Sequence, residues 1–340
     1  MRSQAEINAQ WSKSAEIYDD IIQDELASFR VEGWTKLIKS QIDFKEGMKC
    51  LDTGCGPGFF SIILSKAGFD VTAIDGAELM REKAKENFKK HGADVELLDM
   101  DAHYLDFPDE TFDLVVSRNV THALRDHGRV YSEWRRVLKP GGVLLIFDAN
   151  WHLAWTEPEL REESKRRYKE CIEKYGCDYN GNTTYDDEKF DEVHSDVDKH
   201  QLAGITRPDF DFGVMKAVGF DDITIDRNII EDLWDDKEKL IFGHTPMFMI
   251  RGVKGPDHLI EVCMAGSCQR NGAEEIIKAI KNKLGIPENE TTTPDGKIKV
   301  TESGCLWLCK QPPVISVDGK LYTNVDEDKA ESIIDELMKC

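Results

Sequence analysis

The chain has 340 residues and a formal charge of −21, because 65 acidic residues outnumber 44 basic ones. A single hydrophobic core rarely extends far beyond about 250 residues, so the length predicts two structural units. So acidic a surface repels phosphate backbones and anionic headgroups, and we therefore expect no nucleic acid and no membrane among the partners.

The N-terminal sequence and the cysteine count indicate where the protein works. Residues 1–6 lack the apolar core of a signal peptide, and no apolar run approaches the roughly 20 residues that a membrane span needs. Nine cysteines, an odd number without an export signal, favour metal ligands and free thiols over a disulfide scaffold. We expect a cytoplasmic protein.

An amphipathic helix is predicted at the N-terminus. Its apolar stripe recurs at steps of four and three residues, through Ile7, Trp11, Ala15, Tyr18 and Ile22. The stripe either packs on the core or forms a lid over a bound cofactor.

Short apolar segments then alternate with helix-like stretches from about residue 46 to residue 150. The expected strands are 49–52, 71–74, 95–98, 114–117 and 143–147. Strands that alternate with helices predict a parallel sheet. The Pro and Gly residues of 137–142 predict a turn before the fifth strand.

Residues 151–211, rich in acidic and aromatic side chains, interrupt this alternation and are expected to form a helical cap. The pattern resumes with a helix at 212–218 and strands at 223–225 and 247–253. A linker rich in Gly and Pro follows at 252–256. A shorter α/β pattern comes next, with strands at 259–262, 298–301 and 314–317 and helices at 273–284 and 326–338. We expect domains at 1–253 and 256–340.

A glycine-rich loop, LDTGCGPGF at 51–59, lies where the first strand turns into a helix, so the backbone can approach a ligand closely. Asp75 ends the next strand, where a carboxylate can accept hydrogen bonds from both ribose hydroxyls. Asp101 and Ala102 follow the third strand. Each of these features alone is also found in tight turns or in dinucleotide-binding enzymes, but their combination in this order is specific.

Over about residues 10–253 the sequence resembles the class I, Rossmann-like S-adenosylmethionine-dependent methyltransferases, through LDTGCGPG, AID, DMDA, FDLVVSRN and RVLKPGGVLL. The resemblance implies an α/β fold with a Rossmann-like sheet. It also implies S-adenosylmethionine as the cofactor, and Tyr18 of the N-terminal helix is expected beside it. The implied binding residues are Asp52, Gly54, Gly56, Asp75, Asp101, Ala102, Asn119 and Val120. A carboxylate at Asp52 suits a cationic cofactor better than a pyrophosphate, which disfavours NAD.

The methyl acceptor is expected beyond the ends of the fourth and fifth strands. His122 and His152 lie there, and each is either a catalytic base or a hydrogen-bonded structural histidine. The cap contributes four aromatic residues that either cover a flat substrate or pack in the core: Trp155, Tyr168, Tyr175 and Tyr179.

Four cysteines form the pattern C-x4-C, 36 residues, C-x3-C, through Cys263, Cys268, Cys305 and Cys309. Four thiolates suit an iron-sulfur cluster, and zinc is the alternative, although zinc sites usually use C-x2-C pairs. Over about residues 256–340, with CLWLCKQPPV and DGKLY, the sequence resembles the thioredoxin-like 2Fe-2S ferredoxins. The resemblance implies a small thioredoxin-like α/β domain with a 2Fe-2S cluster on these four cysteines. Trp307 departs from the glycine common in that family.

The two resemblances together predict an enzyme that methylates a small molecule, with a ferredoxin domain that transfers electrons, senses redox state or docks a redox protein partner. Two alternatives stay open. In the first, the chain is a redox or signalling protein that binds S-adenosylmethionine without turnover. In the second, it is a methyltransferase that acts on protein or RNA.

Overall fold

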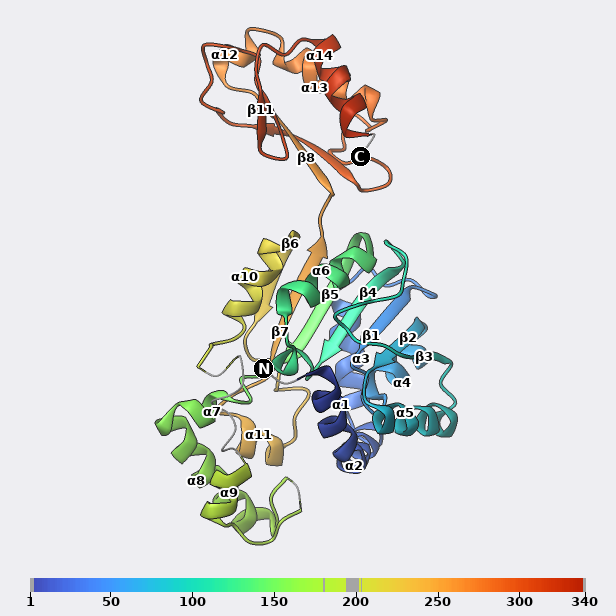
Figure 1. The fold of residues 1–340 in the computed structure, drawn as a ribbon, viewed down its shortest axis with the longest axis vertical. Coiled ribbons are helices and arrows are strands. Elements are labelled where there is room, and N and C mark those ends of the chain that lie inside the picture. The colour runs from blue at the N-terminus through green and yellow to red at the C-terminus, as the bar shows by residue number, and fades with distance from the viewer. Residues whose placement is uncertain (1–2, 180, 194–201, 203, 339–340) are drawn as a thin grey trace. The chain divides into compact units, whose positions relative to one another are not determined.

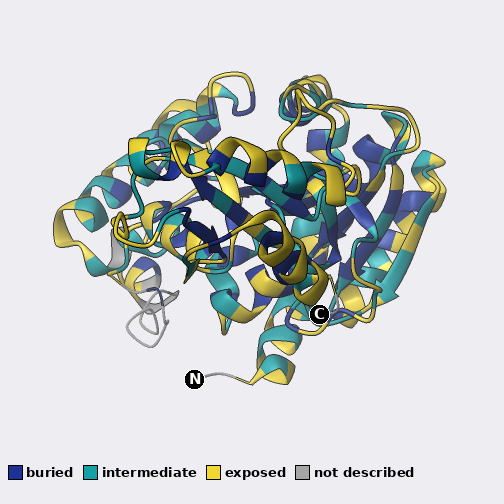
Figure 2. Ribbon diagram, turned by 90° about the horizontal axis from the view of Figure 1, so that it is seen from above, coloured by how far each residue is buried: buried dark blue, intermediate teal, exposed yellow. Residues whose placement is uncertain are grey.

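The computed structural model describes residues 3–179, 181–193, 202 and 204–338. The chain folds into two compact units, Met1–Lys254 and Gly255–Cys340. In both units the central strands are mostly buried and strands at the sheet edges are more exposed, whereas most helices present one buried and one exposed side (Figure 2).

The first unit contains a seven-stranded sheet in the order β3-β2-β1-β4-β5-β7-β6 (Figure 1). Strands β1 to β5 are mutually parallel, and β7 lies antiparallel between β5 and β6. The result is the expected Rossmann-like sheet, in which β7, next to the edge strand β6, is the one antiparallel strand among the seven. The strands are β1 Lys49–Thr53, β2 Asp70–Asp75, β3 Val95–Asp99, β4 Phe112–Arg118, β5 Leu138–Asp148, β6 Phe220–Asp226 and β7 Phe248–Lys254.

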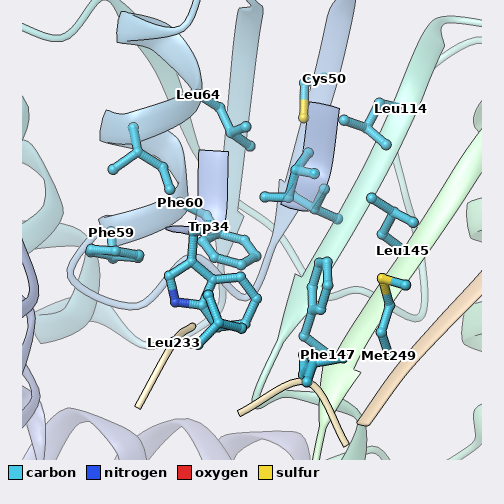
Figure 3. Packing of buried hydrophobic residues seen from close by; sticks show 14 of the residues in the cluster. Trp34, Cys50, Phe59, Phe60, Leu64, Leu114, Leu145, Phe147, Leu233 and Met249 are labelled. Atoms are coloured by element: carbon cyan, nitrogen blue, oxygen red, sulfur yellow. The ribbon is translucent and has the colours of Figure 1, made fainter. Parts of the chain in front are cut away.

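Helices cover both faces of this sheet because its central strands are apolar on both sides. On β5, Leu145 and Phe147 pack with Trp34 of α3 (Figure 3), whereas Leu144 faces the cluster that contains Trp134 of α6. This alternation places two hydrophobic clusters on opposite faces. The covering helices are α3 Arg30–Ser40, α4 Phe59–Lys66, α5 Glu78–His91, α6 His127–Val137 and α10 Asp209–Ala217.

The N-terminal segment forms two helices where the sequence predicted one. Helix α1 (Gln4–Lys13) begins at a capping box on Ser3, and α2 (Ala15–Leu26) begins directly after Ser14. Ser14 ends the first helix and occupies the N-cap position of the second without a side-chain cap hydrogen bond, and a steady apolar periodicity does not reveal this break.

The turn expected at residues 137–142 is also different. Strand β5 already begins at Leu138, and the Pro-Gly-Gly segment is an irregularity in its pairing with β4, because Phe112 pairs with Leu138 but Leu114 pairs with Val143. Gly141 adopts a φ of +75° there, which supplies the bulge.

The cap follows β5. It contains α7 Leu153–Thr156, α8 Pro158–Tyr175 and α9 Asp187–Val193, and α8 packs against α11 Asp236–Phe242. Among the described residues, no helix combines the length and the apolar character needed to cross a bilayer.

The second unit has a four-stranded sheet in the order β11-β10-β8-β9, with β8 and β9 parallel and β10 antiparallel to β8 and β11. Its core joins the strands to α13 and α14 and includes Cys263 and Cys268. The elements are β8 His258–Cys263, α12 Gly266–Gln269, α13 Ala273–Lys283, β9 Ile298–Ser303, β10 Ile315–Val317, β11 Lys320–Tyr322 and α14 Glu327–Leu337.

Candidate functional site

One cavity of about 560 Å³ opens in the first unit, at the carboxyl ends of its parallel strands. Every residue that the sequence analysis assigned to cofactor binding or catalysis in this unit lines it. These are Tyr18, Asp52, Gly54, Gly56, Asp75, Asp101, Ala102, Asn119, Val120, His122 and His152.

The glycine loop is held against β2 and β4 at very close range. Gly54 donates its backbone N–H to the carbonyl of Ile74 at 2.8 Å and adopts a φ of +67°. A Cβ atom at Gly54 would lie 2.6 Å from Val120 Cγ2. Only glycine therefore fits, for reasons of both backbone conformation and space.

Two carboxylates face the cavity beside this loop, the buried Asp52 and the half-buried Asp75. Asp52 accepts a hydrogen bond from the Ser61 hydroxyl at 2.6 Å, and burial raises the pKa of Asp52 to about 6. Asp75 accepts the backbone N–H groups of Gly56 at 2.9 Å and Ala77 at 2.8 Å, while burial raises its pKa above the usual value. Asp75 thus fixes the loop and still has lone pairs directed at a ligand.

Asp101 is held differently from the other two carboxylates. It accepts the Nδ1–H group of His103 at 2.7 Å and a guanidinium N–H of Arg125 at 2.7 Å. Burial alone would raise the pKa of Asp101, but hydrogen bonds from His103 and the charge of Arg125 outweigh it and lower the pKa. Asp101 therefore stays ionised beside the cavity.

Asn119 contributes an acceptor that the protein leaves unused. It follows β4 with a φ of +55°, and its backbone N–H donates to the carbonyl of Phe147 at 2.8 Å. Its side-chain oxygen is buried and has no hydrogen-bond partner in the described part of the chain. A buried acceptor without a donor suits an N–H group of a ligand.

His122 is oriented by Asp148 at the end of β5. Its Nδ1 lies 3.1 Å from Asp148 Oδ1, and its backbone N–H donates to Oδ2 at 2.8 Å. Burial would raise the pKa of Asp148, but His122 and Arg207 outweigh it and hold the pKa well below the usual range. The carboxylate of Asp148 thus fixes the orientation of the imidazole and favours a proton on Nδ1.

Asp148 is the centre of a buried network that the sequence analysis missed. Arg207 donates to Asp148 at 2.9 Å and makes two hydrogen bonds of 2.8 Å to Asp211. Asp148 also accepts from Thr121, Ala149 and Trp151. A charged residue at the end of an apolar strand was a signal for Asp148, but nothing local in the sequence joins it to Arg207.

The N-terminal helices contribute one wall of the cavity. Trp11 lies with its ring centroid 5.7 Å from that of Tyr18 and 6.0 Å from that of His122. The ring of His152 lies 5.8 Å from that of His122. The stripe of the predicted helix therefore covers the cavity as well as packing within the fold.

Residues of the cap line the opposite end of the cavity. Tyr168 and Tyr179 line the cavity, and Tyr175 is not among its lining residues. The side chain of Trp155 lies outside the described residues. Arg118 also lines the cavity, pairs with Glu25 and lies over the ring of Phe59 at 4.8 Å.

In the second unit the four predicted cysteine ligands lie in two pairs. Cys305 Sγ and Cys309 Sγ are 3.6 Å apart, and Cys263 and Cys268 hydrogen-bond each other. Burial opposes ionisation of Cys263, but backbone N–H groups of Leu306 and Ala265 outweigh it and lower the pKa of this thiol.

The paired arrangement fits a 2Fe-2S cluster. Four thiolates can bind the two irons of such a cluster as two pairs. Trp307, between the second pair, has a φ of +64° and a side chain that is 87% exposed. Its ring therefore does not pack over the cysteines.

Two family models match the chain. Residues 51–146 match a family described as a methyltransferase domain, and residues 247–338 match one described as a thioredoxin-like 2Fe-2S ferredoxin. Each unit thus carries its own match.

Curated relatives resemble either one part of the chain or the other. A demethylmenaquinone methyltransferase of Staphylococcus aureus is 36% identical over 120 residues, which cover 34% of this chain and 49% of the relative. A component of the NADH-quinone oxidoreductase of Rickettsia bellii is 37% identical over 91 residues, covering 27% of this chain and 53% of the relative. The chain spans about half the length of these relatives.

Among solved structures, a SAM-dependent methyltransferase of Aquifex aeolicus superposes with a TM-score of 0.44 and 21% identity. The match covers 71% of this chain and 97% of the other.

Proposed function

The chain combines a methyltransferase domain with a thioredoxin-like 2Fe-2S ferredoxin domain, and on this premise we propose that it transfers a methyl group from S-adenosylmethionine to a small-molecule acceptor. One observation carries the proposal. A single cavity joins the glycine loop and its carboxylates to His122 and the aromatic side chains of the cap. Two reactants held in one enclosure are positioned for an in-line transfer, which supplies much of the rate enhancement in such reactions.

The loop side of the cavity would bind S-adenosylmethionine. We assign its ribose to Asp75 and its adenine to the surroundings of Asp101 and Ala102. The free oxygen of Asn119 and the carboxylate of Asp52 face the cavity as acceptors for the ammonium group of the methionine part. Gly54 and Gly56 let the backbone approach the cofactor, and Val120 and Tyr18 complete the walls.

His122 would act on the acceptor. With Asp148 bound to Nδ1, the unprotonated Nε2 can take a proton from the acceptor as its oxygen or nitrogen attacks the methyl carbon. The bond from carbon to the acceptor forms as the bond from carbon to sulfur breaks, and S-adenosylhomocysteine leaves. Asp148 stabilises the imidazolium that results. His152 lies beside His122 as the second candidate base.

Cys263, Cys268, Cys305 and Cys309 would hold the 2Fe-2S cluster, which supplies one-electron chemistry when bound. The exposed Cys309 and Trp307 leave this region open to a redox protein partner. Cysteines that serve as cluster ligands, not as disulfide partners, are typical of a reducing compartment, and we therefore propose that the protein is cytoplasmic.

Calorimetry tests the cofactor site. Asp75→Ala should weaken S-adenosylmethionine binding by roughly tenfold to more than a hundredfold, because a charged hydrogen-bond acceptor is removed. Asp99→Ala is the matched control: Asp99 ends the neighbouring strand β3 but pairs with Arg81 outside the cavity lining. Equal affinities for the parent and Asp75→Ala would refute the assignment.

Turnover is tested with methyl-labelled S-adenosylmethionine and a size-fractionated cell extract. We expect label in the small-molecule fraction, and none with His122→Ala if this residue is the base. Tight cofactor binding without any labelled product would favour a redox module that binds S-adenosylmethionine without turnover. Label in protein or RNA would favour a macromolecular acceptor.

A further inference from the structure

Negatively charged side chains outnumber positively charged ones around the cavity of the first unit. The described Asp, Glu, Lys and Arg residues in its lining are five carboxylates and one guanidinium: Glu25, Asp52, Asp75, Asp101, Glu238 and Arg118. The three aspartates belong to the proposed cofactor side. Glu25 and Glu238 remain, and both act on Tyr179 of the cap: burial is the main cause that raises the pKa of its hydroxyl, and these two carboxylates raise it further.

The arginines at this end do not balance the carboxylates. Arg118 pairs with Glu25. Arg30 is shared between Glu238 and Asp235, whose Oδ2 lies 2.9 Å from Nη2 of the arginine. Three carboxylates thus surround two guanidinium groups. The negative charge that is left over attracts a cation to this end of the cavity.

Glu25 has an oxygen that the protein leaves unused. The residue lies in the last turn of α2, lines the cavity and is only 6% exposed. Its Oε1 accepts from Arg118, whereas Oε2 is buried and has no hydrogen-bond partner within the part of the chain that the structure describes. A buried carboxylate oxygen without a donor destabilises the ligand-free protein, and a charged N–H group of a ligand would form a strong hydrogen bond to it.

Aromatic rings at the cap end add a second attraction for a cation. The ring of Phe242 lies edge-on to four others, at centroid distances of 5.0 Å to Tyr179, 5.8 Å to Trp151, 6.1 Å to Trp234 and 6.4 Å to Tyr168. All five line the same cavity as Glu25. The face of an aromatic ring attracts ammonium groups. We refer to these five residues as the aromatic lobe.

The histidine beside the aromatic lobe adds no positive charge that would repel a cation. His244 follows Phe242 by two residues, its Nε2 lies 2.6 Å from Ser164 Oγ, and both members of this pair line the cavity. Burial, reinforced by the charge of Arg167, lowers the pKa of His244 to about 4, so the imidazole is uncharged at neutral pH.

We propose that Glu25 and the aromatic lobe form the acceptor subsite, and that the acceptor carries an organic ammonium group with at least one N–H. The N–H group donates to Oε2 of Glu25, and the rings of the lobe surround the charge and the apolar body of the acceptor. A quaternary ammonium has no N–H to donate, and an anionic acceptor is repelled by the carboxylates. This inference rests on the proposed methyl transfer and specifies its acceptor.

Binding of three naphthalene probes tests the proposal. The full-length protein, saturated with S-adenosylhomocysteine to prevent turnover, is titrated at neutral pH and followed by probe fluorescence. The probes are 2-naphthylmethylammonium, its N,N,N-trimethyl derivative and the uncharged 2-naphthylmethanol. We expect the primary ammonium to bind roughly tenfold or more tightly than either of the others, because it alone combines the charge with an N–H donor.

Glu25→Gln should weaken binding of the primary ammonium by roughly tenfold to more than a hundredfold and leave the alcohol unchanged. Because this variant leaves Arg118 unpaired, the double variant Glu25→Gln/Arg118→Met, which removes both charges, is measured beside it and should show the same loss. Glu133→Gln is the matched control: Glu133 is 8% exposed and pairs with Arg136 at 3.0 Å, but it does not line the cavity.

The affinity for S-adenosylhomocysteine shows that each variant is folded. The proposal is overturned if the alcohol or the trimethylated probe binds the parent as tightly as the primary ammonium, or if either Glu25 variant keeps the parent's preference for the primary ammonium. Failure of the parent to bind S-adenosylhomocysteine would instead contradict the proposed function, since the probes are also titrated without it.

Discussion

At the scale of single residues, the ionised form of Asp52 destabilises the ligand-free folded protein. Its side chain is almost fully buried and its hydrogen-bond donor is a neutral hydroxyl, so ionisation is opposed by desolvation. The folded protein keeps this proton up to about pH 6, whereas the unfolded chain releases it near 3.8. Stability therefore falls as the pH rises through this window. In the proposed site, the positive charge of bound S-adenosylmethionine would offset this cost.

Asp52→Asn should therefore stabilise the ligand-free protein at pH 8, by about 1 to 3 kcal/mol, because a pKa shift of one unit corresponds to about 1.4 kcal/mol. The difference should shrink below about pH 6, where the parent is already protonated. Urea unfolding at pH 8 and pH 5 checks this expectation. Asp43→Asn is the exposed control and should show no such pH dependence. An equal gain at both pH values would contradict the explanation.

The same variant separates stability from binding. Asn keeps an oxygen for the Ser61 hydroxyl but carries no charge, so S-adenosylmethionine should bind more weakly while the ligand-free protein becomes more stable. Such opposed effects are typical of residues retained for function.

Predicted site residues are easiest to recognise in the sequence where the backbone restricts the choice of residue. Gly54 and Asp75 lie within a loop whose sequence and spacing define its shape, and the structure brings them to one cavity. Arg207 was missed because it reaches Asp148 across 59 residues of chain. Ser164 and His244, 80 residues apart, were missed for the same reason. Residues that meet only in the folded protein show no characteristic spacing in the sequence.

At the scale of elements, the loop between β1 and α4 is the tightest junction of the first unit. Gly54→Ala should destabilise the protein by about 1 to 3 kcal/mol, because it adds a left-handed alanine and a clash with Val120. S-adenosylmethionine affinity should fall more than tenfold, since the loop must move away from β4. Thermal unfolding and calorimetry measure the two effects.

Two further variants separate the backbone strain of Gly54→Ala from its clash with Val120. Gly92→Ala has a similar φ of +61° with no atom within 4 Å of the new Cβ, so it reports the backbone strain alone. Adding Val120→Ala to Gly54→Ala removes the clash and should restore part of the stability. Equal losses for Gly54→Ala and Gly92→Ala would show that the contact with Val120 contributes nothing.

The strands were predictable because each is a short apolar run between turn residues, and the sheet of the first unit contains every strand expected from residue 46 to residue 253. The order of the strands was not predictable. Strand β7 lies antiparallel between β5 and β6, and its pairing with β5 joins segments about 100 residues apart in the sequence. Strand β11 was missed because three residues give no periodicity.

At the scale of the whole molecule, the question is whether the two units influence each other. Only residues 255–257 separate β7 from β8, so the methyltransferase and ferredoxin domains are tethered by a very short segment. Coupling requires that the two redox states interact differently with the substrate-bound enzyme.

We expect methylation kinetics to differ between the oxidised and the dithionite-reduced enzyme once an acceptor is known. Cys305→Ser should abolish the difference, because it removes a cluster ligand and leaves the cavity of the first unit unchanged. Cys177→Ser, in the cap, is the control and should retain it. Iron and sulfide analysis verifies the cluster content of each variant. Equal rates in both redox states would reduce the second unit to a docking element.

The position of β7 also determines how the protein emerges from the ribosome. Strand β5 ends at Asp148, and its partner β7 begins at Phe248. One edge of β5 therefore stays unpaired until about 100 further residues have been synthesised. At 5–20 residues per second this is about 5 to 20 s, during which an almost entirely apolar strand presents unpaired backbone groups. The nascent chain is therefore most prone to aggregation in this interval. The strand that ends it is the last one made before the ferredoxin domain begins, so the methyltransferase sheet can close without any strand of that domain.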